Sequence, residues 1–337
     1  MNDHFNITVL VDAATVPAHD PQFEHPPKEP ITEYHVIESV RLLGHTASVV
    51  DVHDDIGDMI DKIKKAEPHL IFNLTEQFAC LRSMDKNIAA VLEMLHIPFT
   101  GAGTTGLMLC RDKRLCKQIL ARHMIRVPGF VNIPLGRRVR VPRSIRFPLV
   151  VKPALEDGSE GISNASLVWD EDALAERSRF VHERWRQDAI AEEYIDGREL
   201  YVSIMGNARL TVLPIRECFL QKHPEGGPYM ATYRVKWNEA YRDKWGIKFG
   251  FANLGDKVQA QVARVCKKVY RLLHLQDYGR IDVRLAPDDR LVVLEANPNP
   301  GLAYGEEVAE SAEKAGIEYE QFIDRIIRTA IRRFPEC

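Results

Sequence analysis

The sequence has no hydrophobic run long enough to cross a membrane, and it has few cysteines. No window approaches the ~20 apolar residues of a membrane span, and the N-terminal apolar segment at residues 7–11 is too short for a signal peptide. The six cysteines among 337 residues include no C-x-x-C pair and no metal-like spacing with histidine. We therefore expect a cytoplasmic protein with reduced thiols and no membrane partner.

An excess of one charge is also absent, because 45 Lys and Arg residues nearly balance 48 Asp and Glu residues. The net charge of −3 argues against nucleic acid as a partner. One basic cluster, at residues 137–146, has no interleaved aromatic residues, so we interpret it as a solvated surface, with a binding patch as the alternative. The length of 337 residues predicts about two domains, with room for three small ones.

The first third of the chain has an α/β pattern. Short apolar strand patterns alternate with helix patterns, at residues 7–11, 31–43, 46–50, 55–66, 70–74, 84–95 and 98–100. This alternation is typical of a parallel sheet covered by helices on both faces. We therefore predict a Rossmann-like domain over residues 1–107.

From residue 108 onward the pattern changes to α+β. Helices are expected near 112–123, 171–185, 258–272 and 318–334, with strands between them, among them one at 164–168. A hairpin is indicated at 200–215, where Gly206 and Asn207 form the turn. The long segment 219–254 shows no regular pattern, and segments of that length are usually lids or binding loops.

Two strands near the C-terminus bring hard oxygen ligands together. They join through residues 287–289, and side-chain alternation places Glu295 and Asn297 on one face, with Asp282 of the partner strand against them. Two carboxylates and an amide oxygen suit Mg²⁺ that also holds phosphate oxygens. Arg280 lies on the same strand face as Asp282. It is either a salt-bridge partner or a group that stabilises a charged intermediate. The alternative for the whole cluster is a set of solvated hairpin residues.

Two further segments have patterns typical of a nucleotide site. Lys152 ends an apolar strand and precedes a glycine-containing loop, residues 158–161, which offers backbone N–H groups to phosphates or is a plain turn. The segment 191–200 turns between two strands, where it offers backbone groups to an adenine edge and the Glu199 carboxylate to ribose hydroxyls. An ordinary turn with exposed acids is the alternative there.

Taken in order, KPALEDGSEGI, EEYIDGREL, and GRIDVRL with LEANPNPG resemble the ATP-grasp superfamily, specifically its D-alanine–D-alanine ligase-like branch. Residues 91–113 also look like the passage from the first to the central domain of that branch. The resemblance implies an ATP-grasp fold: the Rossmann-like domain 1–107, a central α+β domain 108–198, and a C-terminal α+β domain 199–337 with the metal site and a lid at 219–254. It also implies ATP and two Mg²⁺ ions, which Mn²⁺ can replace, and a homodimer.

The resemblance also implies residue roles. On the nucleotide, Lys113 and Lys152 would hold the α- and β-phosphates, the loop around Ser159 would close over them, and Lys236 would reach the γ-phosphate from the lid. Adenine would be framed by Glu192, Glu193 and Ile195, and the ribose would meet Glu199. In the reaction, Asp282, Glu295 and Asn297 would hold Mg²⁺, Arg280 would steady the acyl phosphate and the tetrahedral intermediate, and the Gly301 N–H would face the oxyanion.

The sequence departs from this branch where the first amino acid would bind. The Gly-Gly-x-Ser-x-Glu motif after the first strand is missing, and Glu29 and Glu33 are unaligned candidates to replace its glutamate. The serine and tyrosine that work with that glutamate correspond to Gly158 and Trp237. Glu306 stands where the branch has a serine for the second substrate's carboxylate, and an acid there favours a cationic or amine-rich acceptor.

Further substrate-pocket candidates are Glu76, in place of part of a His-Gly pair, and Tyr304. We therefore expect an ATP- and Mg²⁺-dependent carboxylate–amine ligase that acts through an acyl phosphate on small molecules other than D-alanine. The alternatives are a D-alanine–D-alanine ligase with a diverged pocket, an ATP-grasp kinase, and a nucleotide-binding regulator without turnover.

Overall fold

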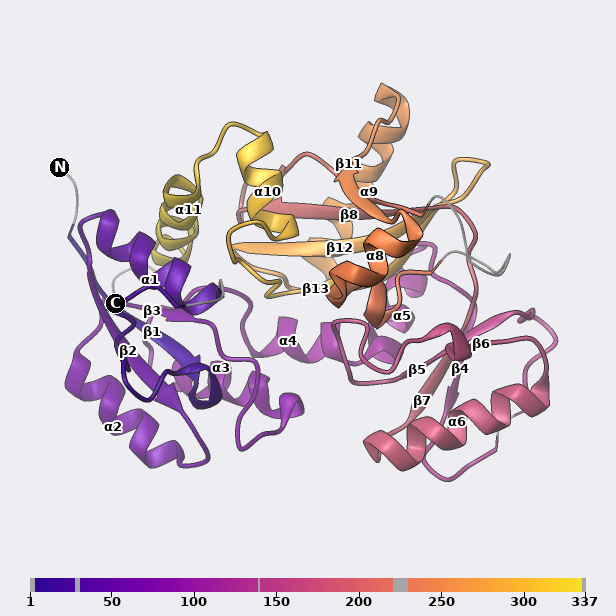
Figure 1. Cartoon of the computed structure of the whole chain (residues 1–337), viewed down its shortest axis with the longest axis horizontal. Coiled ribbons are helices and arrows are strands. Elements are labelled where there is room, and N and C mark those ends of the chain that lie inside the picture. Colours follow the sequence, from indigo (N-terminus) through magenta and orange to yellow (C-terminus); the bar gives the residue numbers. More distant parts are fainter. Residues whose placement is uncertain (1–3, 28–30, 139, 221–229, 335–337) are drawn as a thin grey trace.

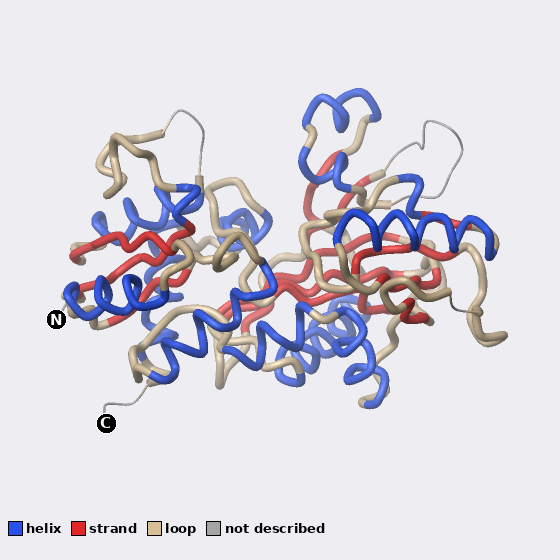
Figure 2. The backbone as a smooth tube through the Cα atoms, turned by 90° about the horizontal axis from the view of Figure 1, so that it is seen from below, coloured by secondary structure: helices blue, strands red, loops and turns tan. Residues whose placement is uncertain are grey.

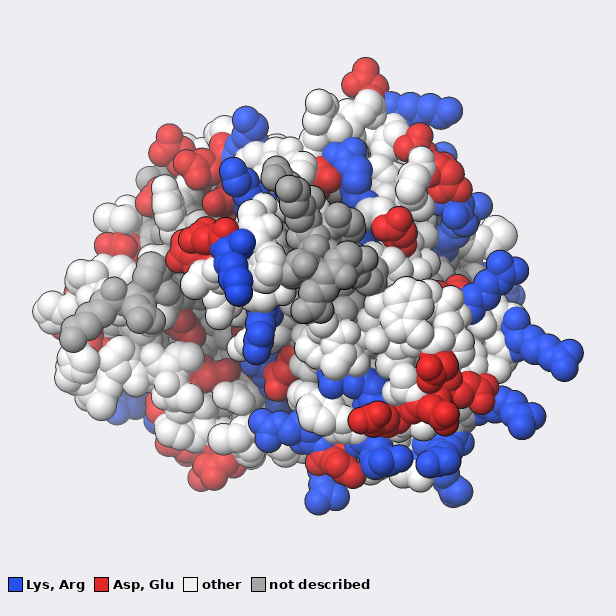
Figure 3. Space-filling view, turned by 45° about the vertical axis from the view of Figure 1, so that its right-hand side comes forward, with Lys and Arg blue, Asp and Glu red and all other residues white. Residues whose placement is uncertain are grey.

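The computed structural model describes residues 4–27, 31–138, 140–220 and 230–334. Glu29 and part of the expected lid lie outside the described residues. Seen from below, the strands gather in separate groups, one near the N-terminus and the other on the opposite side of the molecule (Figure 2). Acidic and basic side chains are interspersed over the face drawn in Figure 3, in line with the near-balanced charge. No described helix is long and apolar enough to cross a bilayer.

The N-terminal part forms the expected parallel sheet with helices on both faces (Figure 1). The strand order is β2-β1-β3, and helices α1 and α11 cover one face while α2 and α3 cover the other. The expected strand at 98–100 is reduced to a single parallel bridge between Ile71 and Phe99. The bounds are β1 Asn6–Asp12, α1 Thr32–Leu42, β2 Thr46–Val52, α2 Ile56–Ala66, β3 Leu70–Asn73 and α3 Asp85–Met94.

Helix α11 (Tyr319–Ile331), at the end of the chain, packs on this first sheet. Its apolar stripe, which includes Phe322 and Ile326, is fully buried against α1 and against strand residues such as Ile7. The N-terminal sheet is therefore covered on one face by a helix that is distant in sequence. The domain limits at residues 107 and 198 remain predictions.

The middle of the chain forms a four-stranded antiparallel sheet of order β4-β7-β5-β6, packed on helix α6 (Glu171–Trp185). The strand expected at 164–168 is mostly a 3-10 turn, because Ser163 caps it and only two residues pair with β5. Helix α4 (Thr104–Arg111) was not predicted. The remaining bounds are α5 Lys113–Arg122, β4 Phe130–Ile133, β5 Leu149–Pro153, β6 Leu167–Val168 and β7 Ala189–Glu193.

The C-terminal part forms a six-stranded sheet of order β11-β10-β8-β12-β13, with β9 on β8. Helix α9 and helix α5 bury their apolar stripes together on this sheet. The hairpin predicted at Gly206 is present, with β9 much shorter than expected. The bounds are β8 Arg198–Met205, β9 Thr211–Val212, β10 Arg216–Phe219, β11 Lys248–Phe251, α9 Asp256–Leu272, β12 Tyr278–Leu285, β13 Leu291–Asn297 and α10 Glu307–Lys314.

The prediction that residues 219–254 are irregular was wrong for the described part of the segment. Helices α7 (Tyr233–Trp237) and α8 (Glu239–Trp245) and strand β11 lie within it. Val235 and Ile247 pack on Tyr201 of β8 in a small core of their own, and Asn238 caps α8. Those few apolar contacts are too dispersed in sequence to show a periodic pattern.

Candidate active site

A pocket lies between the central sheet and the C-terminal sheet, lined by β5, β7, β8, β12 and β13, by the loop around Ser159 and by the segment before and within α7. Strands of two separate sheets thus supply its walls, and most of them are inner strands of their sheet. Nine of the predicted site residues line it, namely Lys152, Ser159, Glu192, Glu193, Ile195, Glu199, Lys236, Asp282 and Glu295.

The predicted oxygen cluster forms as expected. Asp282 pairs directly with Glu295 across β12 and β13, and Arg280 pairs with Asn297 two residues away on the same face. The Arg280 guanidinium donates from Nε to Asp282 Oδ1 at 2.7 Å and from a terminal nitrogen to Oδ2 at 3.2 Å. Asp282 is 2% exposed, so its charge is balanced within the protein.

Cations surround this carboxylate pair. Lys236 Nζ lies 3.8 Å from Asp282 Oδ2, and the ring of Tyr201 lies beneath both Lys236 and Arg280. Burial alone would raise the pKa of Glu295, but Lys113 and Lys236 outweigh it and hold that pKa below the ordinary range. Burial raises the pKa of Asp282, and repulsion by the Glu295 carboxylate adds to that rise. The site therefore has positive charge in excess, as a polyphosphate requires.

A buried ion triad holds the floor of the pocket. Glu192, 2% exposed, receives Lys117 Nζ at 3.0 Å and Lys152 Nζ at 3.1 Å. Lys117 also donates to the Leu294 carbonyl at 2.6 Å, which ties α5 to β13. The two lysines outweigh the effect of burial and keep the pKa of Glu192 low. Sequence reasoning missed Lys117, although a lysine at an apolar-face position of a predicted helix was a usable signal.

Glu199 is fixed by a second residue that the sequence reasoning missed. Arg284 donates to its carboxylate at 2.5 Å, and the Tyr201 hydroxyl donates at 3.0 Å. Burial tends to raise the pKa of Glu199, and Arg284 more than reverses that effect. Both oxygens of Glu199 thus have partners.

Glu193 differs from its expected role. Its carboxylate accepts backbone N–H groups of Gly129 at 3.2 Å and Arg146 at 2.8 Å, which fixes the strand edge. Because neighbouring residues of a strand point to opposite faces, Glu192 faces the ion triad and Glu193 faces away from it. The Glu193 carboxylate is occupied by these two bonds, so only the other atoms of Glu193 are available to the pocket, beside Ile195.

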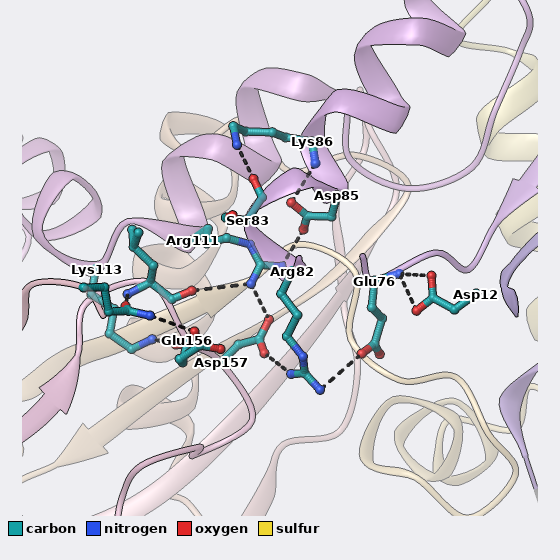
Figure 4. Close-up of polar contacts among 12 residues, drawn as sticks. Asp12, Glu76, Arg82, Ser83, Asp85, Lys86, Arg111, Lys113, Glu156 and Asp157 are labelled. Carbon is teal, nitrogen blue, oxygen red and sulfur yellow. Dashed lines mark hydrogen bonds and ion pairs between the residues drawn. The ribbon is translucent and has the colours of Figure 1, made fainter. Parts of the chain in front are cut away.

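The glycine-containing loop is held from two sides. Gly158 and Ser159 have φ values of 58° and 62°, and Ser159 Oγ donates to the Ala231 carbonyl at 3.3 Å. On the other side Asp157 receives Arg82 at 2.9 Å and Arg111 at 3.3 Å, as Figure 4 shows. The loop is therefore clamped between the start of α7 and two arginines that precede the central sheet.

Lys113 and Glu76 lie at the ends of this network (Figure 4). Lys113 is buried and donates to the Glu156 carbonyl, while burial lowers the pKa of its ammonium against the pull of Glu295. Glu76 donates its N–H to the Asp12 carboxylate and lies 3.9 Å from Arg82. Burial raises the pKa of Asp12 to about 6, although the hydrogen bond from the Glu76 N–H opposes that rise.

The remaining substrate candidates cluster where α10 begins. The Glu306 carboxylate receives the Ala303 N–H at 3.2 Å and fills the space against Gly301, where any Cβ would collide with it. Burial, followed by repulsion from Glu307, raises the pKa of Glu306 to about 7. Tyr304 is exposed, and its backbone N–H donates to Nδ1 of His35 on α1 at 3.1 Å.

A pocket between two antiparallel α+β lobes, with a carboxylate pair in its lining, defines an ATP-grasp protein. Residues 125–328 match the family model "D-ala D-ala ligase C-terminus". The D-alanine–D-alanine ligase of Bordetella petrii is 31% identical over 249 residues, which cover 73% of this chain and 72% of that protein. An uncharacterized protein of Sinorhizobium fredii is 28% identical and covers 89% of this chain and 87% of its own.

Solved structures agree on the fold. The D-alanine–D-alanine ligase of Bacillus anthracis, complexed with ATP, superposes with a TM-score of 0.75 at 22% identity, over 97% of this chain and 98% of that chain. The Coxiella burnetii ligase gives 0.70 at 16% identity, over 97% and 94%. This chain therefore belongs to the D-alanine–D-alanine ligase family and is an ATP- and Mg²⁺-dependent ligase that forms C–N bonds.

The residues present fit the metal. Asp282 and Glu295 offer hard carboxylate oxygens at adjacent positions, and the buried amide nitrogen of Asn297 has no hydrogen-bond partner among the described residues. An amide whose nitrogen is left unbonded is free to turn its oxygen toward a cation.

Proposed function

We propose that this ligase joins a small carboxylic acid to a cationic amine through an acyl phosphate, and that its substrate pair is not two D-alanines. The observation that carries the proposal is Glu306 packed against Gly301, where the resemblance expects a serine beside the oxyanion N–H. A carboxylate at that place repels the carboxylate of a second amino acid and attracts an ammonium group. Glu76, in the N-terminal part of the chain, lies near enough for its charge to act on Glu306, and its N–H is held by Asp12.

The proposed reaction has two steps that balance. An oxygen of the acid attacks the γ-phosphorus of ATP and ADP leaves; the amine nitrogen then attacks the acyl carbon, and phosphate leaves. Lys113 and Lys152 hold the α- and β-phosphates, and Lys236 holds the transferred group. Asp282, Glu295 and Asn297 would hold Mg²⁺, which offsets charge on the transferring phosphoryl group.

The chain's own groups also serve the second step. Arg280 stabilises the acyl phosphate and the tetrahedral intermediate, with the Gly301 N–H toward the oxyanion. An ammonium must lose a proton before it attacks, and Glu306 is placed to bind the ammonium and accept that proton. Adenine lies against Glu192 and Ile195 with backbone of Glu193 beside it, and the ribose meets Glu199. Small molecules are the partners, and we keep the cytoplasmic homodimer as part of this proposal.

The test is Mg²⁺-dependent phosphate release with single and paired D- and L-amino acids and with diamines, each product identified by mass. We expect release that needs an acid together with a basic amine. D-alanine alone giving its dipeptide would overturn the substrate assignment, and a phosphorylated product without an amide would indicate a kinase. Glu306→Ser should weaken use of the basic amine and admit neutral amino acids, whereas unchanged selectivity would remove Glu306 from the acceptor site.

A further inference from the structure

A second cavity, of about 200 Å³, lies between α11 and the β8–β9 hairpin, outside the ATP site. Four guanidinium groups line it: Arg325, Arg328 and Arg332 on the helix and Arg209 on the hairpin. We call it the arginine pocket. Glu199 at the ATP site and Met205 at the arginine pocket lie on the same strand, β8, at a separation of roughly 20 Å for six extended residues.

The charges in the arginine pocket are poorly balanced. Arg328 is bonded to Asp324 at 2.8 Å. In the part of the chain that the structure describes, the guanidinium groups of Arg209, Arg325 and Arg332 have no hydrogen bond or ion pair. Their proximity is not a result of overall charge, because the net charge is −3.

Helix geometry explains why these arginines converge. Arg325, Arg328 and Arg332 are three and four residues apart, so they share one face of α11, opposite the stripe buried on the first sheet. Like charges at this spacing repel one another unless an anion lies between them. The negative end of the helix dipole favours basic residues only in the last turn, and it does not account for Arg209, on another element.

The walls of the arginine pocket are rigid. Asn207 donates to Asp277 Oδ1 at 2.8 Å and to the Thr329 carbonyl of α11 at 3.4 Å, which fixes the hairpin to the helix. Gly206 has a φ of 107°, and a Cβ there would collide with the Arg209 carbonyl, so the turn that presents Arg209 is tight. The backbone that carries Arg209 is therefore fixed against α11, while the side chains of Arg209, Arg325 and Arg332 are exposed and accessible to a ligand.

We propose that the arginine pocket is a binding site for a small organic phosphate. A phosphate ester carries close to two negative charges and accepts paired N–H donors from guanidinium groups, which matches several unpaired arginines better than one carboxylate does. Thr211 and Thr329 also line the cavity, and each carries a hydroxyl that can donate to a phosphate. Met205, Leu213 and Ile317 form an apolar floor, which suits the organic part of such a molecule.

The experiment is calorimetric titration with phenyl phosphate at constant ionic strength, with the ATP site filled by a non-hydrolysable ATP analogue and Mg²⁺. Phenol, which lacks the phosphate, is the ligand control. We expect a dissociation constant of about 1 mM or lower for phenyl phosphate. Arg325→Gln with Arg332→Gln should weaken binding by about tenfold or more and leave the KM for ATP unchanged.

The control variant, Arg137→Gln with Arg138→Gln, removes two exposed charges elsewhere and should bind as the native protein does. Arg209→Gln, on the other wall, should also weaken binding, and circular dichroism checks that each variant is folded. Equal binding by all variants, an equal loss in the control, or no binding to the native protein would overturn the proposal. So would a change of oligomeric state in the Arg325 and Arg332 variant, because the pocket would then face a second copy.

Discussion

The indole Nε1 of Trp237 donates a hydrogen bond to the carbonyl oxygen of Gly158 at 3.0 Å. The bond joins α7 directly to the glycine-containing loop that follows Lys152. The resemblance expects a tyrosine at the position of Trp237 and a serine at the position of Gly158. In this chain the two positions are in contact through the Gly158 carbonyl oxygen. The rest of the Trp237 side chain is largely exposed, with the tryptophan 60% accessible, so the bond does not serve a buried core.

Trp237→Phe should raise the KM for ATP by about three- to tenfold with little change in thermal stability, because it removes one hydrogen bond that holds the closed loop. Steady-state kinetics and thermal melting measure the two effects. Trp169→Phe, at another exposed tryptophan, is the matched control and should change neither. An unchanged KM in Trp237→Phe would show that the bond does not assist closure.

Asp157→Asn should raise the KM for ATP by about two- to fivefold, because the loop loses charge-assisted bonds to Arg82 and Arg111 that are partly exposed to solvent. Arg82→Gln should have a similar effect, and the double variant should be no worse than the more impaired single one. Independent, additive losses in this double-mutant cycle would show that the two residues act separately.

Asp282→Asn and Glu295→Gln should each lower kcat by roughly a thousandfold or more, because metal charge stabilisation is worth several kcal/mol. The folded content should stay native, and residual activity should need far higher Mg²⁺. Asp288→Asn, at the exposed turn between the same two strands, is the control and should remain active. Full activity in either site variant would remove that residue from the metal site.

Glu306 should make stability depend on pH. Its pKa is raised to about 7 in the fold from an ordinary value of 4.5, so the folded state binds the proton more tightly than the unfolded chain. Stability is therefore lost as pH rises from about 4.5 to about 7, by on the order of 1–2 kcal/mol. Glu306→Gln should melt higher than the native protein at pH 8 and similarly at pH 4; equal melting at both would contradict this.

The pairing of Asp282 with Glu295 was accessible from sequence, because a short turn and the two-residue period of strands fix which side chains meet. The same local rules recovered the parallel N-terminal sheet. The partners of Lys117 and Arg284 were not accessible: Lys117 on α5 meets Glu192 of β7, and Arg284 meets Glu199 through the pairing of β12 with β8, a strand that lies far away in the sequence. Local sequence patterns indicate on which face of a strand or helix a residue lies. They do not indicate which side chains from distant parts of the chain pack against that face.

Helix α11 gives the protein a particular order of assembly. As the chain leaves the ribosome, β1, β2 and β3 emerge first with α1, yet the part of the sheet face that α11 covers stays open until Phe322 and Ile326 arrive near the end of synthesis. Contacts between segments so far apart in sequence also slow folding. The nascent N-terminal region thus exposes apolar surface through most of translation.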